Sequence, residues 1–359
     1  MSSEGEAGKV ELGLIGAGRI GRVHAENLAF RIPEAEVLAV ADVLAEAAER
    51  CAADFHIPRA VQDYRPLLED EEIEAIVICS STDTHAQIIE EAAAAGKHIF
   101  CEKPLALSLE EIDRALRAVS KAQVKLQVGF QRRFDPSFRR ARALIEEGKI
   151  GEPHLLRITS RDPEPPPLEY VKVSGGIFLD MTIHDFDMAR FLLQDEVEEV
   201  YATGGALIDE EIGRLGDLDT AVVVLRFRSG ALGVIDNSRK SAYGYDQRVE
   251  VFGSGGMVRV ANRTPDSASL SDSEGVHGPL PLHFFVERYT EAYLEEMRSF
   301  VKAVLEDRPP EVTGEDGRVP VVMGYAARRS VEERRPVKLA EIESSEREFK
   351  DQEGGGAAR

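Results

Sequence analysis

The chain has few cysteines, no long apolar run and no apolar leader. Its 359 residues include three cysteines, Cys51, Cys79 and Cys101, without metal-ligand spacing. This favours unpaired core thiols in a reducing cytoplasm. No apolar run approaches the length of a membrane span, and residues 1–9 are polar where a signal peptide has its apolar centre. We therefore expect a cytoplasmic protein without membrane association.

Positive charge is also scarce. Lys and Arg number 44 against 65 Asp and Glu, which gives a formal net charge of −21. This balance disfavours binding to nucleic acid or to an anionic membrane surface. Part of the acidic excess lies in residues 341–353, ahead of a glycine-rich end. We expect residues 341–359 to form an acidic, disordered tail.

Glycine, in contrast, occurs at an informative spacing. An apolar, β-prone run at residues 10–15 leads into Gly16, Gly18 and Gly21, a G-x-G-x-x-G pattern, and a helix-compatible segment follows. Gly16 permits a tight turn, Gly18 lets a pyrophosphate approach the backbone, and Gly21 lets the helix pack on the strand. The helix N-terminus adds unpaired N–H groups. The motif predicts a dinucleotide site, against the alternative of a structural turn.

An acid follows the next strand-like run, residues 37–41. Asp42 lies about 20 residues beyond the glycines, where a dinucleotide fold needs a carboxylate for a ribose 2′-hydroxyl. The same carboxylate would repel the 2′-phosphate of NADP, and Val43 and Leu44 supply no cation to hold that phosphate. We therefore expect NAD as the cofactor.

The first half of the chain alternates strand and helix patterns. Alternating βαβ units with short apolar strands predict a doubly wound parallel sheet with helices on both faces, a Rossmann-type α/β domain over residues 8–129. Its strands are expected at residues 11–15, 37–41, 75–79, 98–101 and 125–128, and its helices at residues 44–55, 84–95 and 109–122.

The pattern changes after residue 129. Strand-like runs separated by turn signals dominate, and they predict an α+β second domain, residues 130–340, with an open, mostly antiparallel sheet. Its strands are expected at residues 198–207, 220–227, 232–239, 247–252 and 257–260, and its helices at residues 136–147, 176–193 and 289–305.

A first polar constellation, Glu102-Lys103-Pro104, follows the fourth expected strand. Ligands in an open α/β sheet lie beyond the carboxyl ends of the strands, so Lys103 is aimed at the same crevice as the glycine loop. A lysine there can polarise a substrate oxygen or help to move its proton. The alternative is a surface Glu–Lys pair before a proline.

A second constellation lies in the expected helix at residues 176–193. That helix would place Asp180 and His184 at i and i+4 on one face. A neutral imidazole can accept a hydroxyl proton there, and the carboxylate can orient it. The alternatives are a purely structural pair or a metal pair. No cysteine or second histidine stands at ligand spacing nearby, so we expect no metal site.

Together these motifs resemble the glucose–fructose oxidoreductase / inositol dehydrogenase (Gfo/Idh/MocA) family of NAD(P)-dependent oxidoreductases. The resemblance rests on residues 16–21, on Glu102-Lys103-Pro104 and on residues 175–187, which occur in the family's order. Residues 129–135 and 243–246 are similar to those of inositol 2-dehydrogenases in particular.

The resemblance implies roles for individual residues. It implies that Lys103, Asp180 and His184 form the catalytic set, and that subunits form homotetramers through the antiparallel sheet. Besides the glycines, cofactor contacts are expected from Arg19, Ile20, Asp42, Val43, Ser80, Ser81, His85, Glu102 and Lys103. Substrate hydroxyls are expected to contact Arg132, Asp162, Asp187 and Tyr245. Each of these four is also compatible with a structural surface pair, and position does not separate Arg132 from Arg133.

One stretch departs from the family. Some inositol dehydrogenases have a polar His-x-Asn pair on the strand that corresponds to residues 154–161. This chain instead has Arg161 and Asp162 before a proline-rich loop. These two residues are candidates to replace the missing substrate contacts, so the exact polyol stays open.

The function implied is NAD-dependent oxidation of a ring hydroxyl of a cyclic polyol, with myo-inositol oxidised at C2 to 2-keto-myo-inositol (scyllo-inosose) as the first expectation. An alternative on the same scaffold is a dehydrogenase for another inositol or for an aldose sugar. A non-catalytic, NAD-responsive regulator is disfavoured because Lys103, Asp180 and His184 are all present. A purely structural partner protein is disfavoured by the glycine loop with Asp42.

Overall fold

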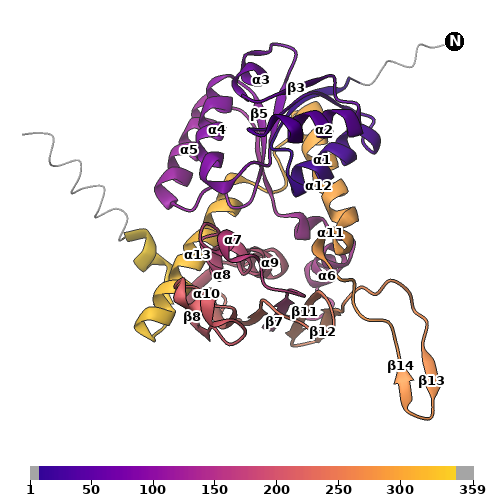
Figure 1. Cartoon of the computed structure of the whole chain (residues 1–359). Helices are drawn as coiled ribbons and strands as arrows, with labels where there is room; N and C mark the ends of the chain where they lie inside the picture. The colour runs from indigo at the N-terminus through magenta and orange to yellow at the C-terminus, as the bar shows by residue number, and fades with distance from the viewer. Residues whose placement is uncertain (1–7, 345–359) are drawn as a thin grey trace, which may run out of the picture. The chain divides into compact units, whose positions relative to one another are not determined.

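The computed structural model describes residues 8–344, and the chain divides into two compact units. The first unit runs to Phe134 and also contains Glu291–Arg318, and the second contains Asp135–Thr290 and the residues from Val319 onward. Figure 1 shows the elements of both units. The division differs from the predicted limits of 8–129 and 130–340 mainly because the chain returns to the first unit over residues 291–318.

The first unit is built on a six-stranded parallel sheet in the order β3-β2-β1-β4-β5-β6. The expected doubly wound α/β fold is confirmed. The order reverses between β1 and β4, so the loops after these two strands flank the crevice in which such sheets bind ligands. The elements are β1 (Val10–Ile15), α1 (Arg19–Phe30), β2 (Ala35–Ala41), α2 (Ala45–Phe55), β3 (Arg59–Val61), α3 (Arg65–Glu69), β4 (Ala75–Ile78), α4 (Thr82–Ala94), β5 (His98–Glu102), α5 (Leu109–Ala122), β6 (Leu126–Gly129), η1 (Gln131–Phe134) and α12 (Thr290–Leu305).

The apolar sequences of these strands agree with their burial. All four residues of β4 are fully buried, as a strand covered on both faces requires. Figure 1 shows α4 and α5 together on one side of the sheet and α1 and α2 on the other. The late helix α12 adds Met297 and Phe300 to the same hydrophobic core, which explains why its segment belongs to the first unit.

The second unit is built on a seven-stranded sheet in the order β12-β11-β7-β10-β9-β8-β15. β7 and β10 pair in parallel and the other neighbours pair antiparallel, so the expected open, mostly antiparallel sheet is confirmed. α9 packs against β7 and α6 against β12. The elements are α6 (Pro136–Glu146), β7 (Pro153–Arg161), α7 (Leu168–Val171), α8 (Ile177–Asp180), α9 (Ile183–Leu193), β8 (Val197–Gly205), α10 (Glu210–Arg214), β9 (Thr220–Phe227), β10 (Leu232–Ser238), β11 (Asp246–Gly253), β12 (Gly256–Val260), β13 (Leu270–Asp272), β14 (Gly275–His277), α11 (Phe285–Arg288), α13 (Gly314–Glu333, which begins in the first unit) and β15 (Val337–Lys338).

The expectation of one helix over residues 176–193 is wrong. Two helices, α8 and α9, are separated by Met181 and Thr182. The Thr182 hydroxyl donates to Asn237 Oδ1 on β10 at 2.6 Å, and the Thr182 N–H donates to the Ile177 carbonyl at 2.9 Å. This tie to the neighbouring strand breaks the helix. Asp180 therefore ends one helix and His184 lies in the first turn of the next, so they do not share one helical face.

The expected core thiols are present. All three cysteines are free. Burial raises the pKa of Cys51 to about 11 and that of Cys101 well above its ordinary value. A thiol in such surroundings is a poor nucleophile, so we assign the cysteines no chemistry.

The predicted acidic tail is described only at its start. Residues 341–344 are helical, and Glu341 accepts a hydrogen bond from Arg335 Nη2 at 2.7 Å. The expectation of disorder therefore does not hold for these four residues, and residues 345–359 lie outside the described part. Among the described helices, none has the length and apolarity needed to cross a membrane.

Candidate active site

The glycine loop after β1 has the backbone that its motif predicted. Gly16 has a φ of +99°, and a Cβ there would lie 2.5 Å from the backbone of Cys79. A Cβ at Gly21 would lie 1.9 Å from the Gly16 carbonyl oxygen, whereas one at Gly18 would meet nothing within 4 Å. The turn and the helix packing thus require glycine at 16 and 21. The open space at Gly18 leaves the N-terminus of α1, with Arg19 and Ile20 as its first residues, accessible to a phosphate.

Asp42 holds this loop in place. Its Oδ2 accepts a hydrogen bond from the Ala17 N–H at 2.8 Å, and its Oδ1 accepts one from the Leu44 N–H at 2.9 Å. The carboxylate therefore lies between the glycine loop and the end of β2, where this fold binds a ribose. Val43 and Leu44 are exposed and carry no charge. An open helix N-terminus and a ribose-side carboxylate without an adjacent cation fit NAD.

A second helix N-terminus lies beside the first. β4 pairs with β1, and α4 begins shortly after β4 ends. Ser81 is the N-cap residue of α4, and Ser80 Oγ lies 2.7 Å from Thr84 Oγ1. The two serines therefore stand at the carboxyl end of β4, and their contact with the cofactor stays a prediction.

The segment Glu102-Lys103-Pro104 begins at the last residue of β5, at the same edge of the sheet. Lys103 is half-buried. His85 of α4 is fully buried, with Nδ1 2.8 Å from the Pro104 carbonyl oxygen and Nε2 3.0 Å from the Ser80 carbonyl oxygen. His85 therefore joins the loop after β4 to the lysine segment, and its predicted contact with the cofactor is untested.

In the second unit, Asp180 at the end of α8 is held by two donors. Arg239 Nη1 donates to Oδ2 at 3.0 Å, and the Tyr170 hydroxyl donates to Oδ1 at 2.8 Å. Arg239 is only 1% exposed and also donates to Asp217 at 3.4 Å. A buried guanidinium between two acids forms charge-assisted hydrogen bonds that fix both carboxylates.

Sequence reasoning missed Arg239 and Tyr170. The one signal for Arg239 was an arginine at the end of the strand-like run 232–239, because an arginine buried by a strand needs an acid partner. Tyr170 follows the proline-rich loop and carries no recognisable pattern.

The start of α9 is polar and buried. His184 is 9% exposed, Asp187 is 1% exposed and Asp185 is fully buried. Asp185 accepts a hydrogen bond from Asn237 Nδ2 at 2.8 Å. Burying three ionisable side chains on one short helix is costly unless they are paired or hydrogen-bonded, and such groups are frequent at functional sites. The structure thus gathers Asp180, with its donors, and these α9 residues in the second unit.

Two arginines next to candidate substrate residues form ion pairs. Arg133 donates to Asp316 Oδ1 at 2.9 Å. Arg161 donates through Nε and Nη2 to Asp236 Oδ1 at 2.9 and 2.6 Å. Both arginines therefore have an acid partner, which gives each of them a structural role.

Arg132 lies in η1 of the first unit and is 5% exposed. Asp162 follows β7 and Tyr245 precedes β11, both in the second unit. Tyr245 is 6% exposed, and its ring lies edge-on to that of Tyr289 at 6.1 Å. Contact of these residues with a substrate stays a prediction.

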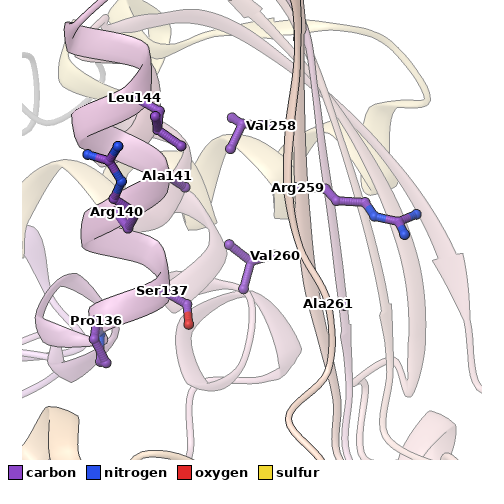
Figure 2. A pocket seen from close by; sticks show the side chains of 9 residues that line it. All are labelled: Pro136, Ser137, Arg140, Ala141, Leu144, Val258, Arg259, Val260 and Ala261. Carbon is purple, nitrogen blue, oxygen red and sulfur yellow. The ribbon is translucent and has the colours of Figure 1, made fainter. Parts of the chain in front are cut away.

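A hollow of about 440 Å³ lies elsewhere in the second unit, between α6 and β12. In Figure 2, Leu144 and Ala141 of the helix face Val258 and Val260 of the strand, whereas Arg259 points away. None of the sequence-predicted site residues lines it. We therefore do not place the substrate there.

Comparison with known proteins agrees with this geometry. Residues 10–130 match the family model described as "Oxidoreductase family, NAD-binding Rossmann fold", and residues 138–259 match the "GFO/IDH/MocA C-terminal domain". The chain is 53% identical to the Myo-inositol 2-dehydrogenase of Thermotoga maritima, over 93% of this chain and 99% of that protein.

Two more distant relatives act on inositols according to their names. A scyllo-inositol 2-dehydrogenase (NAD(+)) of Bacillus subtilis is 38% identical over 92% of this chain and 96% of that protein. The crystal structure of a myo-inositol dehydrogenase from Lactobacillus casei in complex with NAD(H) and myo-inositol superposes with a TM-score of 0.83 at 28% identity, covering 92% of this chain and 96% of that one. The chain therefore belongs to the Gfo/Idh/MocA family of NAD-binding oxidoreductases.

Proposed function

We propose that this chain oxidises the C2 hydroxyl of myo-inositol to 2-keto-myo-inositol, with NAD as the hydride acceptor. The observation that carries the proposal is the glycine loop closed by Asp42. It occurs in a chain that is similar, over 99% of the relative's length, to an enzyme named for this reaction. The reaction removes a hydride from the ring carbon and a proton from its hydroxyl.

Two residues of the chain act on the hydroxyl group of the substrate in this scheme. His184 accepts the hydroxyl proton at the imidazole, as a general base near neutral pH can. Lys103 donates a hydrogen bond to the same oxygen as negative charge develops there, which favours the transition state over the ground state. The catalytic set of Lys103, Asp180 and His184 is thus retained as a proposal.

Asp180 orients the histidine in this scheme. One of its oxygens is bound to Arg239 and the other to Tyr170. A carboxylate fixed in this way needs no reorganisation when the substrate binds, which is the advantage of a preorganised site. Arg239 is therefore a positioning residue in the proposed scheme.

Recognition of the polyol requires donors and acceptors around the ring. Carboxylates accept from hydroxyls, while a guanidinium donates and a phenol does both. We assign this role to four residues already described as candidates: Arg132, Asp162, Asp187 and Tyr245.

We also propose that the open face of the second sheet joins subunits into a homotetramer. Large apolar side chains are exposed at 38–50% towards both ends of this sheet, and grouped apolar side chains on a surface are typical of protein–protein contacts. Tyr201 pairs with Val224 across β8 and β9, and Phe252 pairs with Met257 across β11 and β12. Such a face suits a symmetric contact with a second copy of the chain, and light scattering of the purified protein tests the number of subunits.

The test of function is NADH formation with a matched panel. The purified enzyme is assayed with myo-inositol, scyllo-inositol and glucose, each with NAD and with NADP. The proposal predicts the highest kcat/KM for myo-inositol with NAD. A higher value for scyllo-inositol would assign the chain to the chemistry of its Bacillus subtilis relative, and no turnover with any polyol would overturn the proposal.

A further inference from the structure

Two buried histidines contact the segment that carries Lys103, one on each side of it. His24 of α1 contacts the side chain of Glu102, and His85 of α4 contacts the backbone carbonyl of Pro104. His24 has no part in the proposed function so far, and His85 is known only as a predicted cofactor contact. Both lie in the first unit with Lys103.

The His24 ring is buried between two aromatic rings and bound at one nitrogen. It is fully buried, with its centroid 5.2 Å from that of Phe100 and 5.7 Å from that of Tyr293, edge-on to both rings. Nε2 lies 2.8 Å from Glu102 Oε1, whereas Nδ1 has no hydrogen-bond partner among residues 8–344. An N–H at Nδ1 would lose its hydrogen bond on burial, so the proton belongs on Nε2, which donates to Glu102.

The Glu102 carboxylate is also confined at its other oxygen. A Cβ on Gly129 would lie 2.9 Å from Glu102 Oε2 and 3.1 Å from Glu102 Cα, so the carboxylate packs closely against this glycine. Glu296 of α12 offers a further oxygen, and the ligand atoms of His24, Glu102 and Glu296 lie within 4.8 Å of one another. The carboxylate is thus held by His24 on one side and packs against the backbone of β6 on the other.

The His85 ring contacts the residue that follows Lys103. It is 1% exposed and lies between the carbonyl oxygens of Pro104 and Ser80. A neutral ring can donate to only one of these two acceptors, and burial lowers the pKa of His85, which favours the neutral ring. The shorter contact, from Nδ1 to Pro104, is the one we take to carry the proton.

We propose that His24 and His85 are positioning residues that fix Lys103 by holding the residues before and after it. Neither touches the reacting atoms. The inference rests on the proposed catalytic role of Lys103. A displacement of about 1 Å at a reacting group can cost on the order of a hundredfold in rate, so anchors on both neighbours of a flexible lysine have a direct effect on kcat.

Paired substitutions test each anchor. His24→Gln keeps an amide N–H near the position of Nε2, and His24→Leu removes the donor. His85→Asn keeps an N–H near the position of Nδ1, and His85→Leu removes it. We expect each leucine variant to lower kcat about tenfold to a hundredfold. His24 is not among the predicted cofactor contacts, so the Kd for NAD of His24→Leu, measured by calorimetric titration, should change less than about threefold. The amide variants should recover most of kcat.

A double-mutant cycle separates positioning from general damage. In a Lys103→Ala background the lysine is gone, so His24→Leu should lower kcat by less than about twofold further. If His24→Leu lowers kcat by the same factor in both backgrounds, or if His24→Gln is as impaired as His24→Leu, the positioning role is overturned. If Lys103→Ala itself keeps normal kcat, the proposed function of Lys103 fails instead.

Folding is monitored by thermal unfolding of each variant. Should His24→Leu not fold, His24→Asn replaces it, because its shorter amide does not reach Glu102. The same comparison with His24→Gln and the same cycle then apply.

Discussion

The Asp42 carboxylate accepts a hydrogen bond of 2.8 Å from the Ala17 backbone N–H, 25 residues earlier in the chain. One side chain therefore both closes the glycine loop and presents negative charge to the ribose site. The choice of cofactor and the shape of the loop are coupled through this residue.

The double substitution Asp42→Ser with Val43→Arg should shift preference toward NADP. It removes the charge that repels a 2′-phosphate and adds a guanidinium that can bind it. Asp42→Asn is the matched control, because it removes the charge and keeps one oxygen that can accept from Ala17, at the cost of the acceptor for Leu44. The measurement is the ratio of kcat/KM for NAD and NADP, and an unchanged ratio in the double variant would show that another site controls the choice.

Arg239→Met should destabilise the second unit and lower kcat. It leaves Asp180 and Asp217, whose side chains are 14% and 11% exposed, without their shared cation. Removing one partner of a buried ion pair costs on the order of 3 kcal/mol. Thermal unfolding and kcat are measured beside Lys240→Met, which removes an exposed cation one residue further on. Equal behaviour of the two variants would refute the role of Arg239.

Asp246 should contribute stability that is lost in acid. Burial alone would raise its pKa, but hydrogen bonds from Arg248, Tyr243 and Asn262 hold the pKa below the ordinary 3.8. A depressed folded-state pKa stabilises the fold above the unfolded-state pKa and ceases to do so as the pH falls through the folded-state value.

The free energy of unfolding of Asp246→Asn should therefore fall furthest below that of the wild type at neutral pH. The difference should shrink progressively below about pH 4. Denaturant unfolding of wild type and variant across this range is the measurement, with the exposed Asp266→Asn as control. A difference that is constant with pH would contradict the assignment.

His184→Asn should flatten the pH dependence of the oxidation rate. If His184 is the base, kcat/KM for wild type rises with pH as the coupled group of His184, Asp180 and Lys103 loses its proton. Asparagine keeps a hydrogen-bonding end but cannot accept that proton, so kcat falls far more than polyol binding does. Retention of the wild-type limb at a lower plateau would transfer the titration to another group, Lys103 first.

The sequence predicted the parts of the site that depend on short-range patterns. The glycines and Asp42 each follow a strand-like run, and the parallel pairing of β1 with β2 places the ends of these two strands side by side. The parallel sheet followed from alternating apolar and helical segments, because strands buried on both faces have continuous apolar sequences.

The remaining features depend on contacts that local patterns do not encode. α12 joins the first core through Met297 and Phe300, more than 150 residues beyond that domain's predicted end. The break between α8 and α9 comes from the hydrogen bond between Thr182 and Asn237, 55 residues further along the chain. Helical periodicity alone gives no sign of it. Arg239 meets Asp180 for the same reason, through the sheet rather than through sequence spacing.

The most direct test of the proposed reaction is hydride transfer from myo-inositol deuterated at C2. We expect the NADH formed to carry one deuterium, found by mass spectrometry, and the unlabelled substrate to react faster wherever hydride transfer limits the rate. The same measurement with Lys103→Ala should give labelled product at a rate lower by about a hundredfold. Unlabelled NADH from the deuterated substrate would show that the hydride leaves another carbon, and would contradict the assignment of this chain to oxidation at C2.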